Sequence, residues 1–103
     1  MKIQSDIKSE VEKKISTFNR QNKCKYVARY KGQFLYLDRA SGFSGSLSPI
    51  CRLTFSGDIE SWDFAIYKFS RESYDSEEWF FPGSEHVDGT IEGAMSAGLE
   101  AYT

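Results

Sequence analysis

Cysteine and histidine are scarce in this chain, and long apolar segments are absent. The two cysteines are Cys24 and Cys51, and the first residues lack the charged and then apolar pattern of an export signal. Two such thiols are expected to stay reduced, because cytosolic glutathione keeps cysteine pairs open. The longest apolar run is only a few residues, which argues against a membrane-spanning helix. The sequence therefore predicts a cytoplasmic protein with no membrane contact.

The single histidine, His86, restricts the catalytic chemistry that the sequence can support. One imidazole cannot complete a metal site alone, and nothing in the sequence brings a thiol close to it. Seven of the fifteen acidic residues form two groups, at 58–63 and 72–78, and neither group has the spacing of a calcium loop. We therefore predict no enzymatic activity, no catalytic residue, no cofactor and no metal. A metal-assisted hydrolase built on the two acidic groups is the weakest of the alternatives.

The net charge of -2 conceals an uneven distribution along the chain. Residues 1–39 contain ten basic and four acidic side chains, whereas residues 40–103 contain three basic and eleven acidic ones. This pattern is typical of a chain with a basic surface and an acidic surface for different partners. The alternative is that the two halves neutralise each other inside the fold, and we favour that interpretation.

The N-terminal segment has the hydrophobic period of a helix. Ile7, Val11, Ile15 and Phe18 recur at spacings of three or four residues, which predicts an amphipathic helix over residues 6–20. Ser5 is the expected N-cap, because its hydroxyl can accept a hydrogen bond from a free amide of the first turn.

Aromatic residues make up 16% of the chain, and between residues 25 and 69 they alternate with polar residues at period two. Such alternation predicts strands, because aromatic side chains pack well on a pleated surface. Segments 26–30 and 33–37 flank Lys31 and Gly32, which suit a tight turn. Two further strands are expected at 50–55 and 62–69. Residues 79–83 are expected to cover the last strand or to form a short edge strand.

A second helix is predicted at the C-terminal end, with Asp88 or Thr90 as its cap. Gly93 and Gly98 lie in its interior, where glycine costs about 1 kcal/mol, so a close approach to the sheet is expected. Leucine at position 98 is then expected to destabilise the fold by about 1–3 kcal/mol. We predict one α+β domain over residues 1–103. Its two layers are an antiparallel four-stranded meander and N- and C-terminal helices packed on one face, in the order α-β-β-β-β-α.

The favoured function is a non-enzymatic protein-interaction module. In segment 74–82, large aromatic side chains lie next to acidic ones, and aromatic anchors among polar residues are typical of protein contact sites. Such a surface suits a basic, apolar partner, and the chain itself is expected to be a monomer or a weak homodimer. The residues predicted to bind another protein are Tyr74, Trp79, Phe81 and His86.

Single-stranded nucleic-acid binding is the alternative function. In the first hairpin, cationic side chains alternate with tyrosines, which is how single-strand platforms combine charge with stacking. The isoelectric point near 5.4 and the lack of an RNA-binding signature argue against it. The residues of this alternative are Lys25, Tyr26, Arg29, Tyr30, Lys31 and Tyr36.

Three segments also resemble those of a group of small, single-domain prokaryotic proteins of unknown function. They read Trp-Asp-Phe-Ala-Ile-Tyr at 62–67, Trp-Phe-Phe-Pro-Gly at 79–83 and Gly-Thr-Ile-Glu-Gly-Ala at 89–94. The resemblance implies a compact α+β domain. It implies no activity, cofactor or site residue.

Overall fold

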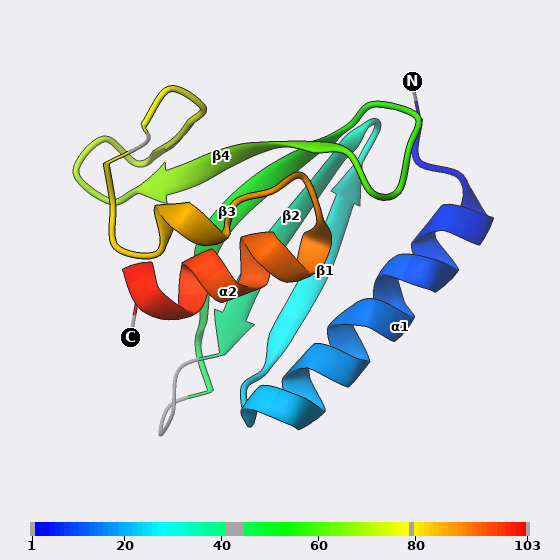
Figure 1. Cartoon of the computed structure of the whole chain (residues 1–103), viewed down its shortest axis with the longest axis horizontal. Helices are drawn as coiled ribbons and strands as arrows, with labels where there is room; N and C mark the ends of the chain where they lie inside the picture. Colours follow the sequence, from blue (N-terminus) through cyan, green and yellow to red (C-terminus); the bar gives the residue numbers. More distant parts are fainter. Residues whose placement is uncertain (1, 41–44, 79, 103) are drawn as a thin grey trace.

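The computed structural model describes residues 2–40, 45–78 and 80–102, and these form an α+β fold around one antiparallel sheet (Figure 1). The strands follow each other in the sheet in chain order, β1-β2-β3-β4-β5. The elements are α1 (Ser5–Asn22), β1 (Tyr26–Lys31), β2 (Phe34–Ala40), β3 (Leu47–Phe55), β4 (Trp62–Lys68), β5 (Ser73–Asp75), the 3-10 helix η1 (Ser84–His86) and α2 (Ile91–Ala101).

The predicted α+β meander is confirmed, with one correction: the sheet has five strands rather than four. The additional strand, β5, pairs with β4 through Ile66 and Asp75, Tyr67 and Tyr74, and Lys68 and Ser73. A strand of three residues is too short to show an alternating pattern in the sequence, since period two needs at least four residues to be distinguished.

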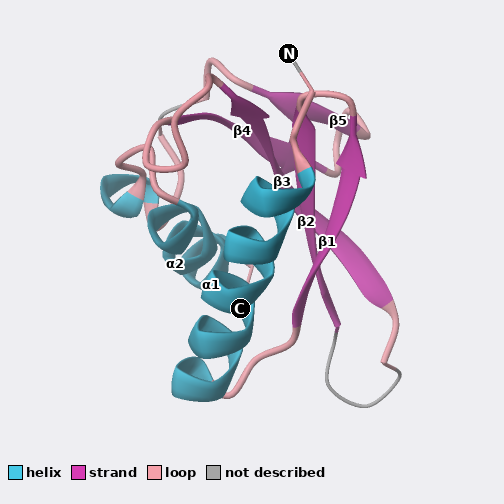
Figure 2. Cartoon of the chain, turned by 90° about the vertical axis from the view of Figure 1, so that its right-hand side faces the viewer, coloured by secondary structure: helices cyan, strands magenta, loops and turns pink. Residues whose placement is uncertain are grey.

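Both helices lie on the same side of the sheet (Figure 2). In the described part of the chain, no helix covers the opposite side. Two-layer folds bury one face of the sheet under helices and leave the other face to solvent or to a partner. None of the helices in the described residues has the length and apolar character needed to span a bilayer.

Helix α1 is slightly longer than predicted, and its cap differs. Its core-facing stripe is Val11, Ile15 and Phe18, all buried, as the spacing indicated. Ser5 is the first helical residue rather than the cap. Gln4 occupies the cap position and makes no side-chain capping bond, so the expected Ser5 cap is wrong.

Helix α2 begins as predicted, with Thr90 as its N-cap. The Thr90 hydroxyl accepts a hydrogen bond from the Gly93 amide at 2.9 Å, and Asp88 accepts in turn from the Thr90 amide and hydroxyl. These bonds satisfy donors that the first turn of a helix leaves free.

Gly98 is the point at which α2 meets the sheet. A Cβ atom at this position would lie 2.4 Å from the Tyr26 hydroxyl oxygen and 2.5 Å from Cγ2 of Ile50. The Tyr26 hydroxyl donates to the Met95 carbonyl at 2.7 Å, and Arg39 donates to the Gly98 carbonyl at 3.1 Å. The close approach expected from the glycine is therefore present, and it brings a buried tyrosine against the helix backbone.

The burial of Tyr26 predicts a loss of stability in alkali. Burial raises the pKa of its phenol well above the ordinary value of about 10. Above about pH 10 the Tyr26 phenol of the unfolded chain releases its proton, whereas the buried phenol of the folded chain retains it. The free energy of unfolding therefore falls as pH rises. The expected slope from this group is about 1.4 kcal/mol per pH unit.

Urea unfolding between about pH 9 and pH 11, followed by circular dichroism, measures this slope. The variant Tyr26→Phe is expected to show a shallower slope. The variant is not expected to lose the slope completely, because burial and the hydrogen bond to Glu12 also raise the pKa of Tyr30. Equal slopes in the two proteins would contradict the prediction.

Candidate functional site

The sheet face that no helix covers carries an array of aromatic and arginine side chains. Strand register places Arg29 beside Tyr36, Tyr36 beside Arg52, and Tyr67 beside Tyr74, all pointing away from the helices because side chains alternate along a strand. We call the following residues the outer-face cluster: Arg29, Phe34, Tyr36, Arg52, Tyr67 and Tyr74.

The rings of the outer-face cluster touch one another in a continuous chain. Ring centroids lie 6.2 Å apart for Phe34 and Tyr36, 5.4 Å for Tyr36 and Tyr74, and 5.1 Å for Tyr74 and Tyr67. This row of rings continues past the C-terminal end of β4 to Phe69, whose centroid lies 4.9 Å from that of Tyr67. Such tilted and edge-on pairs are the favoured geometries of aromatic contacts.

The two arginines of the cluster lie over these rings. The Arg29 guanidinium lies 4.8 Å from the Tyr36 centroid, and that of Arg52 lies 4.9 Å from Phe34 and 5.5 Å from Tyr74. Attraction between a cation and the face of a ring contributes about 0.5–1 kcal/mol at exposed sites. These contacts hold both guanidinium groups against the rings of the cluster.

Arg29 is neutralised within the cluster, whereas Arg52 is not. Arg29 donates to both carboxylate oxygens of Asp38, at 2.5 and 3.2 Å, and this hydrogen bonding raises the pKa of the Arg29 guanidinium. Asp38 is buried, next to an irregularity in the β2–β3 register. The Arg52 Nε atom is buried and, in the described residues, has no hydrogen-bond partner. A buried donor without an acceptor is costly, and in the part of the chain that the structure describes this Nε is the buried side-chain polar atom left without a partner.

Two hollows flank the cluster. One, of about 520 Å³, lies over the first hairpin, and the other, of about 480 Å³, lies between the end of β3 and the segment after β5. The first hollow is lined by Arg29, Tyr30, Lys31, Tyr36 and Tyr74. The second is lined by Arg52, Thr54, Trp62, Asp63, Phe64, Ser76, Val87 and Gly89.

Of the four residues predicted as a protein-binding site, the three that the structure describes do not lie together. Tyr74 belongs to the outer-face cluster, whereas Phe81 stacks on Phe64, at 5.9 Å, on the helix side of the sheet. His86 lies in η1, beside α2. Trp79 lies outside the described residues. Phe80, which the sequence did not single out, is 96% exposed.

The residues of the nucleic-acid alternative divide between the two faces. Arg29, Lys31 and Tyr36 share the outer face. Tyr26 is 2% exposed and bonded to the Met95 carbonyl, so its ring cannot stack on a base. Tyr30 points toward α1 and donates to Glu12, and Lys25 precedes β1. Three of the six predicted residues therefore share the outer face, and a fourth, Tyr30, lines the first hollow from the β1 edge together with Tyr74.

The acidic groups serve turns and ion pairs. Asp58 accepts from the Glu60 amide, and Asp75 accepts from the Glu77 amide and pairs with Arg71. Across the described ranges, neither acidic group gathers three possible ligands around one point. The thiols are also unsuited to nucleophilic chemistry, because burial raises the pKa of both Cys24 and Cys51.

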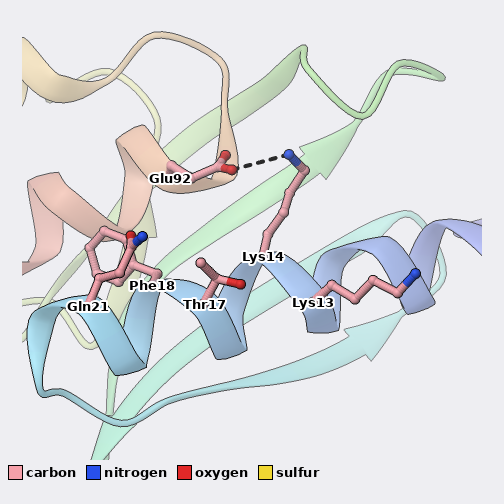
Figure 3. Close-up of a pocket in the computed structure, with 6 residues that line it drawn as sticks. All are labelled: Lys13, Lys14, Thr17, Phe18, Gln21 and Glu92. Atoms are coloured by element: carbon pink, nitrogen blue, oxygen red, sulfur yellow. Dashed lines mark hydrogen bonds and ion pairs between the residues drawn. The ribbon is translucent and has the colours of Figure 1, made fainter.

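The contact between α1 and α2 tests the idea that the two charged halves neutralise each other. Lys14 reaches from α1 to Glu92, at 3.1 Å, and to Glu60, at 3.4 Å. Lys13 points away from Glu92 (Figure 3). The hydrogen bond to Glu92 raises the pKa of Lys14. Among the described residues these are the ion pairs that join the halves, so internal neutralisation is real but confined to one lysine.

Comparison with known proteins adds no functional information. No protein-family model, no curated protein and no solved structure gives a significant match to the chain. The resemblance to small prokaryotic proteins therefore stays a prediction, and the functional argument depends on the site geometry alone.

Proposed function

We propose that this chain is a non-enzymatic domain that binds another protein through the outer-face cluster. The observation that carries the proposal is the row of stacked tyrosine and arginine side chains on the sheet face opposite the helices. Tyrosine and arginine are enriched at the centres of protein interfaces, because each combines a large contact area with hydrogen-bonding groups.

The charge of this face indicates an acidic partner rather than the basic one expected from the sequence. Asp38 already neutralises Arg29, which leaves Arg52 and the exposed Lys31 as the cations available to a ligand. A carboxylate from a partner would pair with the Arg52 guanidinium, which makes no ion pair with any described residue. The partner is therefore expected to present acidic side chains beside an apolar or planar group.

The cytoplasm remains the proposed location. Both cysteines are free thiols, which suits a reducing compartment.

The second candidate is single-stranded nucleic acid at the same face. The hollow of about 520 Å³, in which Arg29, Lys31 and Tyr36 converge with Tyr74, favours it. Stacking of bases on aromatic side chains contributes about 1–3 kcal/mol per base. The guanidinium groups, however, already occupy ring faces that bases would need, so we rank this candidate second.

One set of variants separates the two candidates. Arg52→Ala and Tyr74→Ala change the outer face, and Lys13→Ala, on an exposed position of α1, is the matched control. Affinity capture from a lysate is expected to recover a partner with the wild type and with Lys13→Ala but not with the outer-face variants. Loss of a hot-spot residue of this kind costs about 2 kcal/mol or more, a roughly 30-fold weaker complex.

A labelled oligonucleotide titration at low salt completes the test. Salt-sensitive binding that Tyr74→Ala abolishes would replace the protein-binding proposal with the nucleic-acid candidate. Capture that is equal for all variants would overturn the proposal outright. Thermal melts of each variant confirm that the fold is intact, since these side chains lie at the surface.

A further inference from the structure

A second group of side chains, away from the outer-face cluster, has the composition of a metal site. Glu85 and His86 come from η1 and Glu100 from the last turn of α2, and one ligand atom from each lies within 4.8 Å of the others. His86 Nε2 and Glu100 Oε1 are 2.8 Å apart. The side chains of His86 and Glu100 are 40% and 49% exposed, so an ion can reach them.

The backbone around this group is held closely against α2. A Cβ atom at Gly83, the residue before η1, would lie 2.7 Å from the Ala97 carbonyl oxygen and 2.8 Å from the Glu100 Cβ. At Gly93 it would lie 2.4 Å from the His86 carbonyl oxygen. Both elements that supply ligands are therefore fixed relative to each other by backbone contacts that only glycine permits.

We propose that Glu85, His86 and Glu100 form a zinc-binding site that fastens η1 to α2. Zinc accepts imidazole nitrogen and carboxylate oxygen at about 2.0–2.2 Å in a tetrahedral arrangement, with water completing a set of three protein ligands. Carboxylates on exposed side chains can rotate to close a spacing of 4.8 Å around such an ion. The Nε2 atom gives up its hydrogen bond to Glu100, and both atoms bind the ion instead.

The ligand set selects zinc over the common hard cations. Calcium and magnesium need six or more oxygen ligands, whereas this site offers two carboxylates and one imidazole. Without a metal, the same atoms make an exposed ion pair, which contributes little to stability. If the three residues bind zinc, a titration with zinc changes the His86 signals and the melting temperature. If they form only an ion pair, neither quantity changes.

His86 gives a direct readout because it is the only histidine in the chain. Its imidazole signals in a proton NMR titration with zinc are expected to shift until one equivalent is bound, and magnesium is expected to leave them unchanged. The melting temperature should rise by roughly 10 °C or more when zinc exceeds its dissociation constant about 100-fold. The titration is done in the Cys24→Ser background, which removes the half-buried thiol as a competing ligand.

Three variants and one control complete the experiment. Calorimetry with His86→Gln is expected to show no zinc binding, and Glu85→Gln and Glu100→Gln should each weaken it by about 10-fold or more. Glu10→Gln, an exposed carboxylate on α1, should bind zinc as the wild type does. Unmoved His86 signals at zinc concentrations up to about 0.1 mM would overturn the proposal, as would unchanged affinity in His86→Gln.

Discussion

Replacing Gly98 with alanine is expected to destabilise the protein by about 3 kcal/mol and to lower its melting temperature by roughly 10–20 °C. The new Cβ would lie 2.4 Å from the Tyr26 hydroxyl oxygen and 2.5 Å from Ile50, distances at which one group must move. Displacing Tyr26 breaks its buried hydrogen bond to the Met95 carbonyl. Overpacking and the lost bond together exceed the gain of about 1 kcal/mol in helix propensity.

A double-mutant cycle with Tyr26→Phe identifies the cause. Removing the hydroxyl oxygen eliminates one of the two clashes, so Gly98→Ala is expected to cost less in the Tyr26→Phe background than in the wild type. Thermal and urea unfolding of the four proteins give the coupling energy. Strictly additive costs would show that the hydroxyl is not the obstacle, and an unchanged melting temperature in Gly98→Ala would contradict the packing of α2 on the sheet.

Replacing Gly93 with alanine is expected to destabilise the protein by about 2 kcal/mol. Its Cβ would lie 2.3 Å from Asp88 Oδ1 and 2.4 Å from the His86 carbonyl oxygen. Relief of this clash moves the segment in which Asp88 holds Thr90 in the N-cap position of α2. The variant therefore loses cap bonds as well as packing, and this loss exceeds the gain in helix propensity.

Thr90→Ala is the matched control, because it removes only the cap hydroxyl and should cost about 1 kcal/mol. Chemical denaturation compares the two variants, and the His86 imidazole signal reports whether η1 has moved. We expect that signal to shift in Gly93→Ala and to stay close to its wild-type position in Thr90→Ala. The opposite pattern would show that η1 is not in contact with α2 at Gly93.

The order and type of the main elements could be predicted because each is encoded by a local period. The stripe of Val11, Ile15 and Phe18 predicted α1, and the alternating aromatic residues predicted the long strands. The short strand β5 escaped prediction because three residues carry no usable period, and only pairing with β4 defines it. The Ser5 cap was wrong because a cap depends on backbone angles that the residue type only favours.

The outer-face cluster could be predicted only in part. Tyr36 and Tyr74 were both named, but for different functions, because 38 positions separate them and only the sheet register brings their rings to 5.4 Å. Arg52 was missed, since an arginine between buried neighbours is an ordinary outward-facing strand residue until its partners are known. His86 and Glu100 likewise come together only through the approach of η1 to α2.

By itself, the sequence determined the main elements of this protein, the alternation of aromatic and polar side chains along its strands and the need for a close approach at Gly98. Those properties follow from residue spacing and side-chain chemistry, which act over a few positions. Only the tertiary structure decided which sheet face the helices cover, that Lys14 pairs with Glu92, and which rings and cations meet on the free face. These contacts join distant segments, so strand register and helix packing select them.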